Sequence, residues 1–325
     1  MKLESEAQKL YQYGLELLHQ GNNEEAYKLF LKAHQLDPND VEAINLLGIC
    51  SYQKQDHMSA LSFFNSANIL APHSPFTLNN LGLIHNGLEQ FQIALEYLDH
   101  SIAINPDIPE THNNRGNSLK GLRRYPESIS SYEKAIAIRP NYAEALSNLG
   151  IVLLEQNKPE MAINIFEKAI KANPNLASIF NSLGNAYTQL GNSKYAYQNF
   201  NRAIEINPNY LDAYLNFGNS LKKFKQHEDA ILCYQSALQI SPQHAKTFYL
   251  LGEIYYDIGN SAQSKRYFSE SLRLDDANIE AKYALAMAQI PKVANNIEEL
   301  TTSRNSFANE LLKLQADTIQ VHSVE

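Results

Sequence analysis

The chain has 325 residues, of which 44% are hydrophobic and 10% aromatic, with a mean hydropathy of -0.38 and a formal net charge of -8. This acidic balance, with a pI near 5.7, argues against a nucleic-acid-binding surface spread over the protein. The longest apolar runs are far shorter than the ~20 residues of a membrane helix, and the N-terminus MKLESEAQKL has no apolar secretory core. We therefore expect a cytoplasmic protein that binds no membrane.

After an N-terminal extension over residues 1–6, a pattern of 34 residues repeats eight times, from residue 7 to residue 278. Position 8 of each repeat is a glycine: Gly14, Gly48, Gly82, Gly116, Gly150, Gly184, Gly218 and Gly252. Position 20 is small: Ala26, Ala60, Ala94, Ser128, Ala162, Ala196, Ala230 and Ser264. Position 24 is bulky: Phe30, Phe64, Leu98, Tyr132, Phe166, Phe200, Tyr234 and Phe268. Position 32 is proline in all but the last repeat: Pro38, Pro72, Pro106, Pro140, Pro174, Pro208, Pro242 and then Asp276.

The residue types of each repeat predict two helices, A and B, joined by a turn. Two apolar stretches with helical spacing flank turn-forming segments such as QGNN (20–23) and LGNS (190–193). The glycine on helix A and the small residue on helix B let the two helices cross closely, and the bulky residue fills the space beside the crossing. The proline ends helix B, because it cannot continue a helix. We expect the asparagines that follow it to help start the next helix A: Asn39, Asn141, Asn175 and Asn209.

This period and these residues resemble the tetratricopeptide repeat family. The resemblance implies an all-α, right-handed superhelical solenoid with a concave groove, in which stacked neighbours bury the apolar faces that one repeat cannot bury alone. The predicted repeats span residues 7–40, 41–74, 75–108, 109–142, 143–176, 177–210, 211–244 and 245–278. Residues 279–290 predict a capping helix. Residues 291–325 predict a junction helix over 297–314 and then a loose tail.

One face of helix A collects amide side chains. Positions 4, 7, 8 and 11 point into the core, whereas positions 2, 5, 6, 9 and 12 share a second face that lines the groove in solenoids of this kind. The candidate groove residues are Asn79, Asn80, Asn113, Asn114, Asn117, Asn148, Asn181, Asn185, Asn216 and Asn219.

Two hypotheses for these amides remain open. In the first, they brace neighbouring helices. In the second, they stay free as a ladder that grips the backbone of an extended chain, because an amide offers a donor and an acceptor as a peptide bond does. We favour the ladder, and the O-linked N-acetylglucosamine transferase family is similar in having one.

The segment THNNRGNSL (111–119) contributes three of these asparagines and one exception, Arg115. Arg115 occupies position 7, where six other repeats have Leu or Phe and the first has Tyr13. Its stem lies on the apolar packing while the guanidinium reaches out, or it pairs with a carboxylate, or it touches a ligand. A carboxylate clamp for a peptide C-terminus is disfavoured, because positions 2 and 5 are mostly acidic, polar or amide and Lys246 is the only lysine among them. The acidic residues are Glu42, Glu110, Glu144 and Asp212.

The C-terminal run AQIPKVANNIEELTTSRNSFANELLKL resembles the junction that follows the repeats in bacterial proteins similar to O-linked N-acetylglucosamine transferases, including the SPINDLY-like group. The matching residues are Ile290, Pro291, Glu298, Glu299, Leu300, Arg304 and Phe307. Such a transferase needs an α/β catalytic region, which this chain lacks before it ends at Glu325. We expect either the repeat arm of a longer enzyme or a free-standing protein that keeps the junction.

The sequence predicts no catalytic centre, cofactor or metal site. No HExxH motif, His/Cys ligand pair or Gly-rich phosphate loop occurs, and His85 and His112 fall at helix A positions typical of structural residues. Cys50 and Cys233 are expected to be buried, reduced thiols. The basic turns KGLRR (120–124) and KKFK (222–225) are expected to be solvated, with an edge patch for an acidic partner as the alternative.

These observations predict a protein–protein interaction scaffold that binds extended polypeptide segments in an asparagine-lined groove. The alternative is the substrate-recognition arm of a protein O-glycosyltransferase whose catalytic domain lies outside this chain. The sequence identifies neither the partner nor the oligomeric state.

Overall fold

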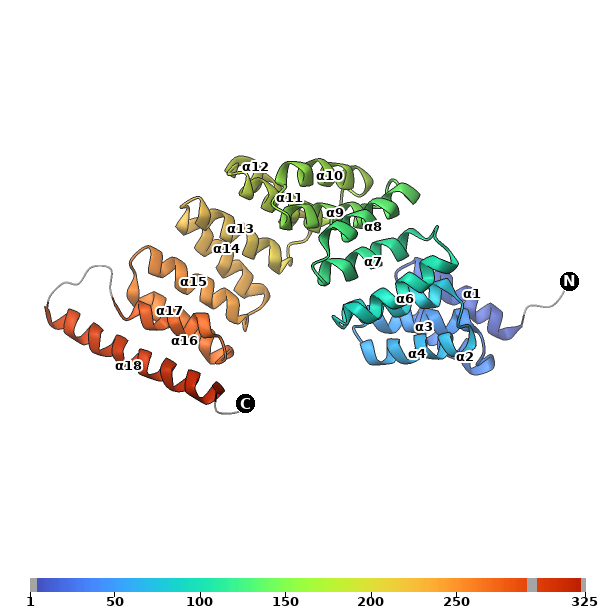
Figure 1. Cartoon of the computed structure of the whole chain (residues 1–325), viewed down its shortest axis with the longest axis horizontal. Coiled ribbons are helices and arrows are strands. Elements are labelled where there is room, and N and C mark those ends of the chain that lie inside the picture. Colours follow the sequence, from blue (N-terminus) through green and yellow to red (C-terminus); the bar gives the residue numbers. More distant parts are fainter. Residues whose placement is uncertain (1–4, 291–296, 323–325) are drawn as a thin grey trace. The chain divides into compact units, whose positions relative to one another are not determined.

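The computed structural model describes residues 5–290 and 297–322, which form helices and connecting turns (Figure 1). The described helices are α1 (Glu6–His19), α2 (Asn23–Leu36), α3 (Val41–Gln53), α4 (His57–Leu70), α5 (Pro75–Gly87), α6 (Phe91–Ile104), α7 (Pro109–Gly121), α8 (Tyr125–Ile138), α9 (Ala143–Glu155), α10 (Pro159–Ala172), α11 (Ala177–Gln189), α12 (Ser193–Ile206), α13 (Leu211–Lys223), α14 (His227–Ile240), α15 (Ala245–Asp257), α16 (Ser261–Leu274), α17 (Ile279–Ala288) and α18 (Ile297–His322). The predicted all-α repeat fold is confirmed.

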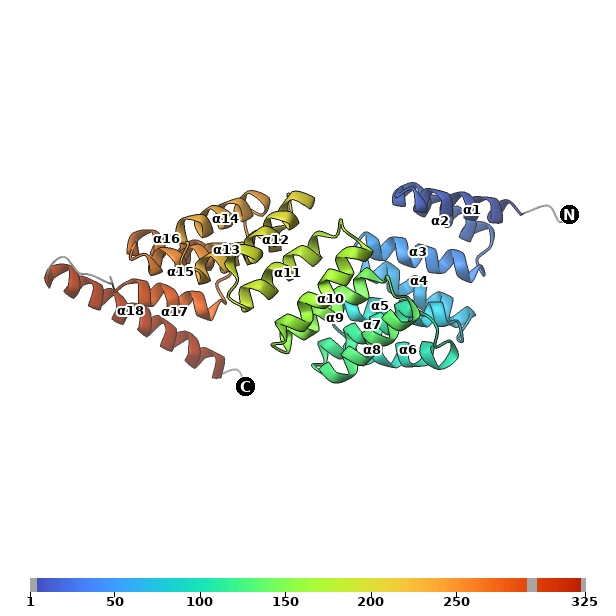
Figure 2. The same cartoon turned by 90° about the horizontal axis from the view of Figure 1, so that it is seen from above.

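The helices follow the repeat without slippage, since every helix B runs from position 17 to position 30 of its repeat. Every helix A but the first begins at position 1. Helix A packs against helix B of its own repeat. Within each unit helix B also packs against the next helix A, and some successive A helices, such as α5 and α7, touch (Figure 2). In the first seven repeats the proline lies two residues beyond the end of helix B, where it cannot interrupt a helical hydrogen bond.

The crossing of the two helices explains the glycine of each repeat. A Cβ atom on Gly116 would lie 2.4 Å from Cε1 of Tyr132, and one on Gly48 would lie 2.4 Å from Cε1 of Phe64. Both rings are completely buried. Helix A therefore has no room for a side chain at position 8, because the bulky residue of helix B fills that space.

Position 15 of every repeat, in the turn between the helices, has a positive φ angle. Glycine occupies it in three repeats, at Gly21, Gly191 and Gly259. In the other five the residue is non-glycine, with φ between 54° and 67°: Gln55, Glu89, Arg123, Asn157 and Lys225. The turn thus has the same left-handed geometry throughout, and the sequence does not mark it with glycine in most repeats.

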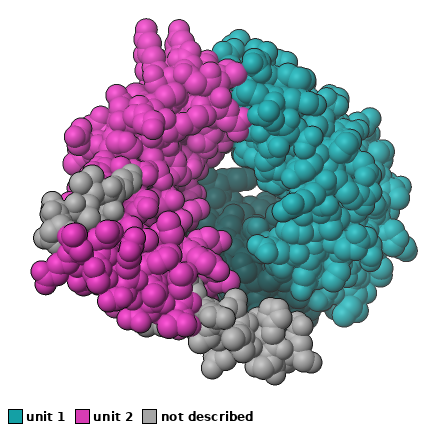
Figure 3. Space-filling model, turned by 60° about the vertical axis from the view of Figure 1, so that its left-hand side comes forward, with its two compact units in different colours: residues 1–174 teal, residues 175–325 magenta. Residues whose placement is uncertain are grey.

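The chain divides into two compact units, residues 1–174 and residues 175–325, which Figure 3 shows in two colours. The division follows Pro174, at the end of the fifth helix B. Each unit has apolar clusters between its own helices. In the first unit one such cluster is built around Phe30 and Leu47, and another around Phe64 and Leu81. In the second unit a cluster is built around Tyr234 and Leu251.

The asparagines that follow the prolines do not cap the next helix, so this prediction was wrong. The N-cap lies one residue later, at Asp40, Tyr142, Leu176 and Tyr210. Of these four side chains only that of Asp40 accepts backbone hydrogen bonds, from Glu42 and Ala43. The connection between helix B and the next helix A thus has two residues after the proline, one more than we expected.

After the repeats, α17 ends two residues earlier than predicted, with Ala286 buried where the repeats have glycine. The last helix, α18, runs to His322, so the predicted loose tail is wrong for residues 315–322. Its sequence QADTIQVH contains no glycine or proline to stop the helix. Pro291 and the rest of 291–296 lie outside the described residues.

Of the helices described, none combines the length and the apolar composition that a bilayer crossing requires. Cys50 is buried as expected, whereas Cys233 is only partly buried. Burial raises the pKa of both thiols, and that of Cys233 reaches about 12, because the uncharged thiol is favoured away from water.

Candidate functional site: the asparagine face of the A helices

The predicted amide residues are brought together across successive A helices. In the first link, Asn45 on α3 donates through Nδ2 to the carbonyl oxygen of Val41 and to Oγ1 of Thr77, both at 2.9 Å. A carbonyl oxygen only accepts, so this contact fixes which end of the Asn45 amide is nitrogen. Its Oδ1 therefore faces α5, where it accepts from Nδ2 of Asn80 at 3.4 Å.

The same link recurs along both units. The position 6 amide donates through Nδ2 to Oδ1 of the position 5 amide on the preceding A helix. The distances are 3.0 Å for Asn114 to Asn79, 3.0 Å for Asn148 to Asn113 and 3.1 Å for Asn216 to Asn181. The bracing role that we set against the ladder is thus present at these residues. We call the linked residues the amide row: Asn45, Asn79, Asn80, Asn113, Asn114 and Asn148 in the first unit, and Asn181 and Asn216 in the second.

Bracing leaves part of each amide unused. Oδ1 of Asn80, Asn114 and Asn148 accepts no hydrogen bond from the described residues, and the side-chain N–H groups of Asn79 and Asn113 donate none to them. None of these atoms is among the buried side-chain atoms that lack a partner. The amide row therefore keeps unpaired acceptors at position 6 and unpaired donors at position 5 that are not fully enclosed, although Asn79, Asn80, Asn113 and Asn114 are only 6–8% exposed.

Position 9 shows two different arrangements. Asn117 and Asn219 accept through Oδ1 from the hydroxyls of Tyr132 and Tyr234, each at 2.7 Å. Burial raises the pKa of both tyrosines, so their hydroxyls stay protonated and donate. The side-chain N–H groups of these two asparagines donate no hydrogen bond to the described residues. Asn185 differs, because helix B of its repeat has Phe200 in place of tyrosine.

Two further residues belong to this face, and we did not single them out from the sequence. Asn86 at position 12 donates to the carbonyl oxygen of Asn114 at 2.8 Å and accepts from the Ser118 hydroxyl at 2.8 Å, and it thereby ties α5 to α7. Phe76 at position 2 of α5 is 64% exposed, on the same helix face as Asn79 and Asn80. The only sequence signal for Phe76 is an aromatic at a position that is otherwise mostly polar.

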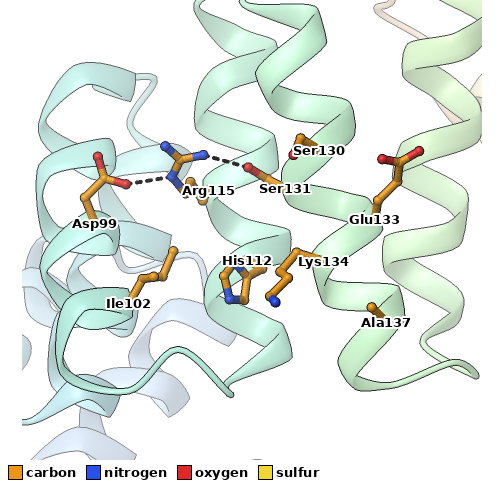
Figure 4. Close-up of a pocket in the computed structure, with 9 residues that line it drawn as sticks. All are labelled: Asp99, Ile102, His112, Arg115, Ser130, Ser131, Glu133, Lys134 and Ala137. Carbon is orange, nitrogen blue, oxygen red and sulfur yellow. Dashed lines mark hydrogen bonds and ion pairs between the residues drawn. The ribbon is translucent and has the colours of Figure 1, made fainter.

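Arg115 points away from this face and forms an ion pair. Its Nε donates to Asp99 on α6 at 2.6 Å, and its Nη1 donates to Ser131 on α8 at 2.8 Å (Figure 4). Of the three alternatives for Arg115, the structure realises the pairing with a carboxylate. The side chains lie around a hollow of about 520 Å³, which His112 and Lys134 also line.

The two histidines that the sequence places on helix A each contact a neighbouring group. His112 contacts the carbonyl oxygen of Pro106 through Nε2 at 2.7 Å, and His85 contacts Oε1 of Gln90 through Nδ1 at 2.7 Å. Both histidines are buried, as expected of structural residues. Among the described residues no group of His, Cys, Asp and Glu is placed to hold a metal ion.

The comparisons with known proteins agree with this repeat architecture. Models of the tetratricopeptide repeat match residues 7–40, 77–105, 107–175, 177–210, 199–231 and 245–278, and a TPR repeat model matches residues 218–259. The matches at 7–40, 177–210 and 245–278 have the same bounds as three of the predicted repeats. No curated protein matches the chain in sequence.

Solved structures share the fold at low sequence identity. A chain of the APC/C hetero-tetramer Cut9-Hcn1 is 16% identical, with a TM-score of 0.67 over 81% of this chain and 52% of that one. A tetratricopeptide repeat protein from Parabacteroides merdae is 18% identical, with a TM-score of 0.60 over 76% of this chain and 98% of that one. This chain thus spans about half the length of the Cut9-Hcn1 chain, and the likeness shows the fold alone.

Proposed function

This chain belongs to the tetratricopeptide repeat family, and we propose that it is an interaction scaffold whose amide row holds extended segments of partner proteins. Proteins of this family generally mediate protein–protein interactions. The observation that carries the proposal is the set of amide atoms that have no partner among the described residues after the bracing bonds are made and that are not fully enclosed.

The open atoms suit a polypeptide backbone because they alternate in kind. An extended chain presents C=O groups and N–H groups along its length. Oδ1 of position 6 is complementary to a backbone N–H, and the N–H groups of positions 5 and 9 are complementary to a backbone C=O. Such contacts depend on the backbone, so the proposal predicts binding of segments with differing sequences. The exposed ring of Phe76 adds an apolar contact beside the row in the first unit.

The bracing bonds also favour binding. Because each amide of a linked pair is held by its neighbour, its open atoms are oriented before a partner arrives. A preorganised site loses less side-chain entropy when the complex forms. Bracing and ladder are therefore compatible uses of the same side chains.

The test uses an array of short unstructured peptides probed with the full chain, followed by fluorescence anisotropy on the peptides that bind. Asn185→Ala removes a partly buried amide opposite Phe200, which offers it no hydroxyl, so the variant is expected to keep its stability. We expect binding to weaken about 3- to 10-fold, as for the loss of one typical hydrogen bond. Asn164→Ala, the same substitution at an exposed site on α10, is the control and should bind as the wild type does.

A second variant tests the row as a whole, with Ala at Asn80, Asn114, Asn148 and Asn216. We expect it to lose most peptide binding. If it binds every array peptide with unchanged affinity, the amide row is not the binding surface and the proposal fails.

The alternative, the recognition arm of a protein O-glycosyltransferase, rests on the resemblance of the C-terminal junction. It predicts that the open reading frame continues beyond Glu325 into a nucleotide-sugar-binding domain. A stop codon there would exclude this alternative for the chain. Both proposals use the amide row in the same way.

A further inference from the structure

A hollow of about 520 Å³ lies at the turn between α13 and α14, in the second unit. It is lined by Asn219, Lys222, Lys223, Lys225, His227 and Asp257. Three lysines and one carboxylate face this space, although the protein as a whole carries a net charge of -8. The hollow is therefore a local positive site on an acidic protein. We call it the lysine hollow.

The three lysines differ in how far their charges are neutralised. Nζ of Lys222 is 2.9 Å from Oε2 of Glu253 and 3.9 Å from Oδ2 of Asp257, so its charge is shared with α15. Nζ of Lys223 donates to the neutral carbonyl oxygen of Thr188 at 2.8 Å. Lys225 is exposed and forms no ion pair with the described residues. Two of the three positive charges thus have no carboxylate partner in the part of the chain that the structure describes.

The repeat geometry brings these lysines together. Lys222 and Lys223 are the last two residues of α13, and Lys225 has the left-handed conformation of the turn, with φ 67°. His227, the first residue of α14, borders the opposite side. Because the turn geometry is the same in all repeats, the convergence of charge comes from the residue types and not from a change in backbone.

The lysine hollow continues the amide row. Asn216, Asn219 and Lys222 are positions 6, 9 and 12 of α13, and residues spaced by three lie on one helix face. Oδ1 of Asn219 is already occupied by the Tyr234 hydroxyl, so Asn219 presents N–H groups. A segment that leaves Asn216 along α13 therefore meets hydrogen-bond donors and positive charges: the Asn219 amide and then the lysine ammonium groups.

We propose that the lysine hollow binds the carboxylate of an Asp or Glu side chain in the segment held by the amide row of the second unit, an inference that rests on the proposed function. Carboxylate oxygens accept from ammonium and amide N–H groups, and they match the sign of the site. Lys222 already takes a carboxylate from Glu253 within the chain. The hollow contains no arginine, whose forked guanidinium favours phosphate groups. The lysine hollow therefore selects acidic segments through their charge, whereas the amide row binds the segment through hydrogen bonds to its backbone.

Glu253 acts as an internal competitor in this arrangement. Its carboxylate occupies Lys222 when no partner is bound, and it also accepts from the Tyr249 hydroxyl at 3.3 Å. Glu253→Gln keeps the side-chain shape and removes one negative charge beside Lys222, which then has Asp257 as its remaining carboxylate neighbour. We expect this substitution to strengthen the binding of an acidic peptide.

The experiment compares two versions of a peptide selected from the array, one with Glu and one with Gln at the same positions, by fluorescence anisotropy with the full chain. At about 0.05 M salt we expect the Glu peptide to bind roughly 3- to 10-fold more tightly, and at about 0.5 M salt we expect the two affinities to converge, because exposed charges are screened. Lys225→Glu should remove the preference and leave the affinity for the Gln peptide unchanged. Glu253→Gln should increase the preference.

Arg123→Glu is the matched control, since Arg123 occupies the same turn position in the fourth repeat, with φ 57°. This variant reverses an equivalent charge in the same backbone geometry outside the hollow, so the preference should persist. Equal affinity of the wild type for both peptides, with both bound, would overturn the lysine hollow and leave the scaffold proposal standing. An array on which the chain binds no peptide would overturn both proposals. A phosphoserine peptide bound more tightly than the Glu peptide would overturn the assignment to carboxylates.

Discussion

The bracing bond between Asn114 and Asn79 leads to a quantitative prediction. Asn114→Ala removes the donor to Oδ1 of Asn79, a bond of 3.0 Å between two side chains that are 7% and 8% exposed. A buried acceptor left without a partner costs about 1–3 kcal/mol, and we expect a loss of unfolding free energy in this range. Asn79→Ala leaves the donor, Nδ2 of Asn114, without its acceptor, and we expect a similar loss of unfolding free energy.

The double variant separates bracing from simple loss of packing. When both amides become alanine, no polar group is left unpaired, so the penalty for the stranded partner disappears. We expect the double variant to be at least ~1 kcal/mol more stable than the sum of the two single effects predicts. Asn185→Ala, which removes an amide outside the linked pairs, should change stability by less than ~0.5 kcal/mol.

Urea unfolding followed by circular dichroism measures these free energies. Because repeats can unfold separately, hydrogen exchange of the α7 amides supplies a local measurement of the same free energy. Additive effects within ~0.3–0.5 kcal/mol would show that the two amides do not interact, and the bracing account of the row would be refuted.

Three further predictions concern the repeat geometry and the raised pKa values of Cys233 and Tyr142. Gly116→Ala places a Cβ 2.4 Å from the Tyr132 ring, which is completely buried and held by Asn117. We expect the variant to be less stable, because overpacking costs about 1–3 kcal/mol and the gain in helix propensity is about 1 kcal/mol. A higher free energy of unfolding in urea would contradict this. Lys225→Gly relieves the strain of a non-glycine residue in the left-handed conformation and should raise the free energy of unfolding by up to ~1 kcal/mol. Gly191→Ala in the equivalent turn should lower it by a similar amount. Unfolding midpoints identical to that of the wild type would argue against strain in the turn. The pKa values of Cys233 and Tyr142 are raised to about 12 in the folded chain, so the folded state retains protons that the unfolded chain releases. The free energy of unfolding should therefore fall as the pH rises from about 9 towards 12. A urea midpoint that is constant or rises between about pH 8 and 10.5 would contradict this direction.

The helices were predictable because their signals are local and repeated. The spacing of Gly116, Ser128 and Tyr132 in one repeat is found in all eight with similar residue types, so a single interpretation applies along the chain. Position 15 is the exception, because Arg123 and Lys225 adopt the geometry of Gly191 without a sequence signal. The packing of the two helices around the turn decides that conformation.

The sequence also placed the asparagines on one face of helix A, because helical periodicity alone determines which positions share a face. It left open whether these amides are braced or free, since that depends on which atoms meet across residues 35 positions apart. The stacking of successive A helices sets those distances, and it brings Nδ2 of Asn114 to Oδ1 of Asn79. The same holds for Arg115, whose carboxylate partner lies on the preceding helix B and not within its own repeat. Periodicity thus determined the face, and tertiary contacts decided which atoms on it are bonded and which are open, because hydrogen bonds depend on the distances and directions between side chains of different helices.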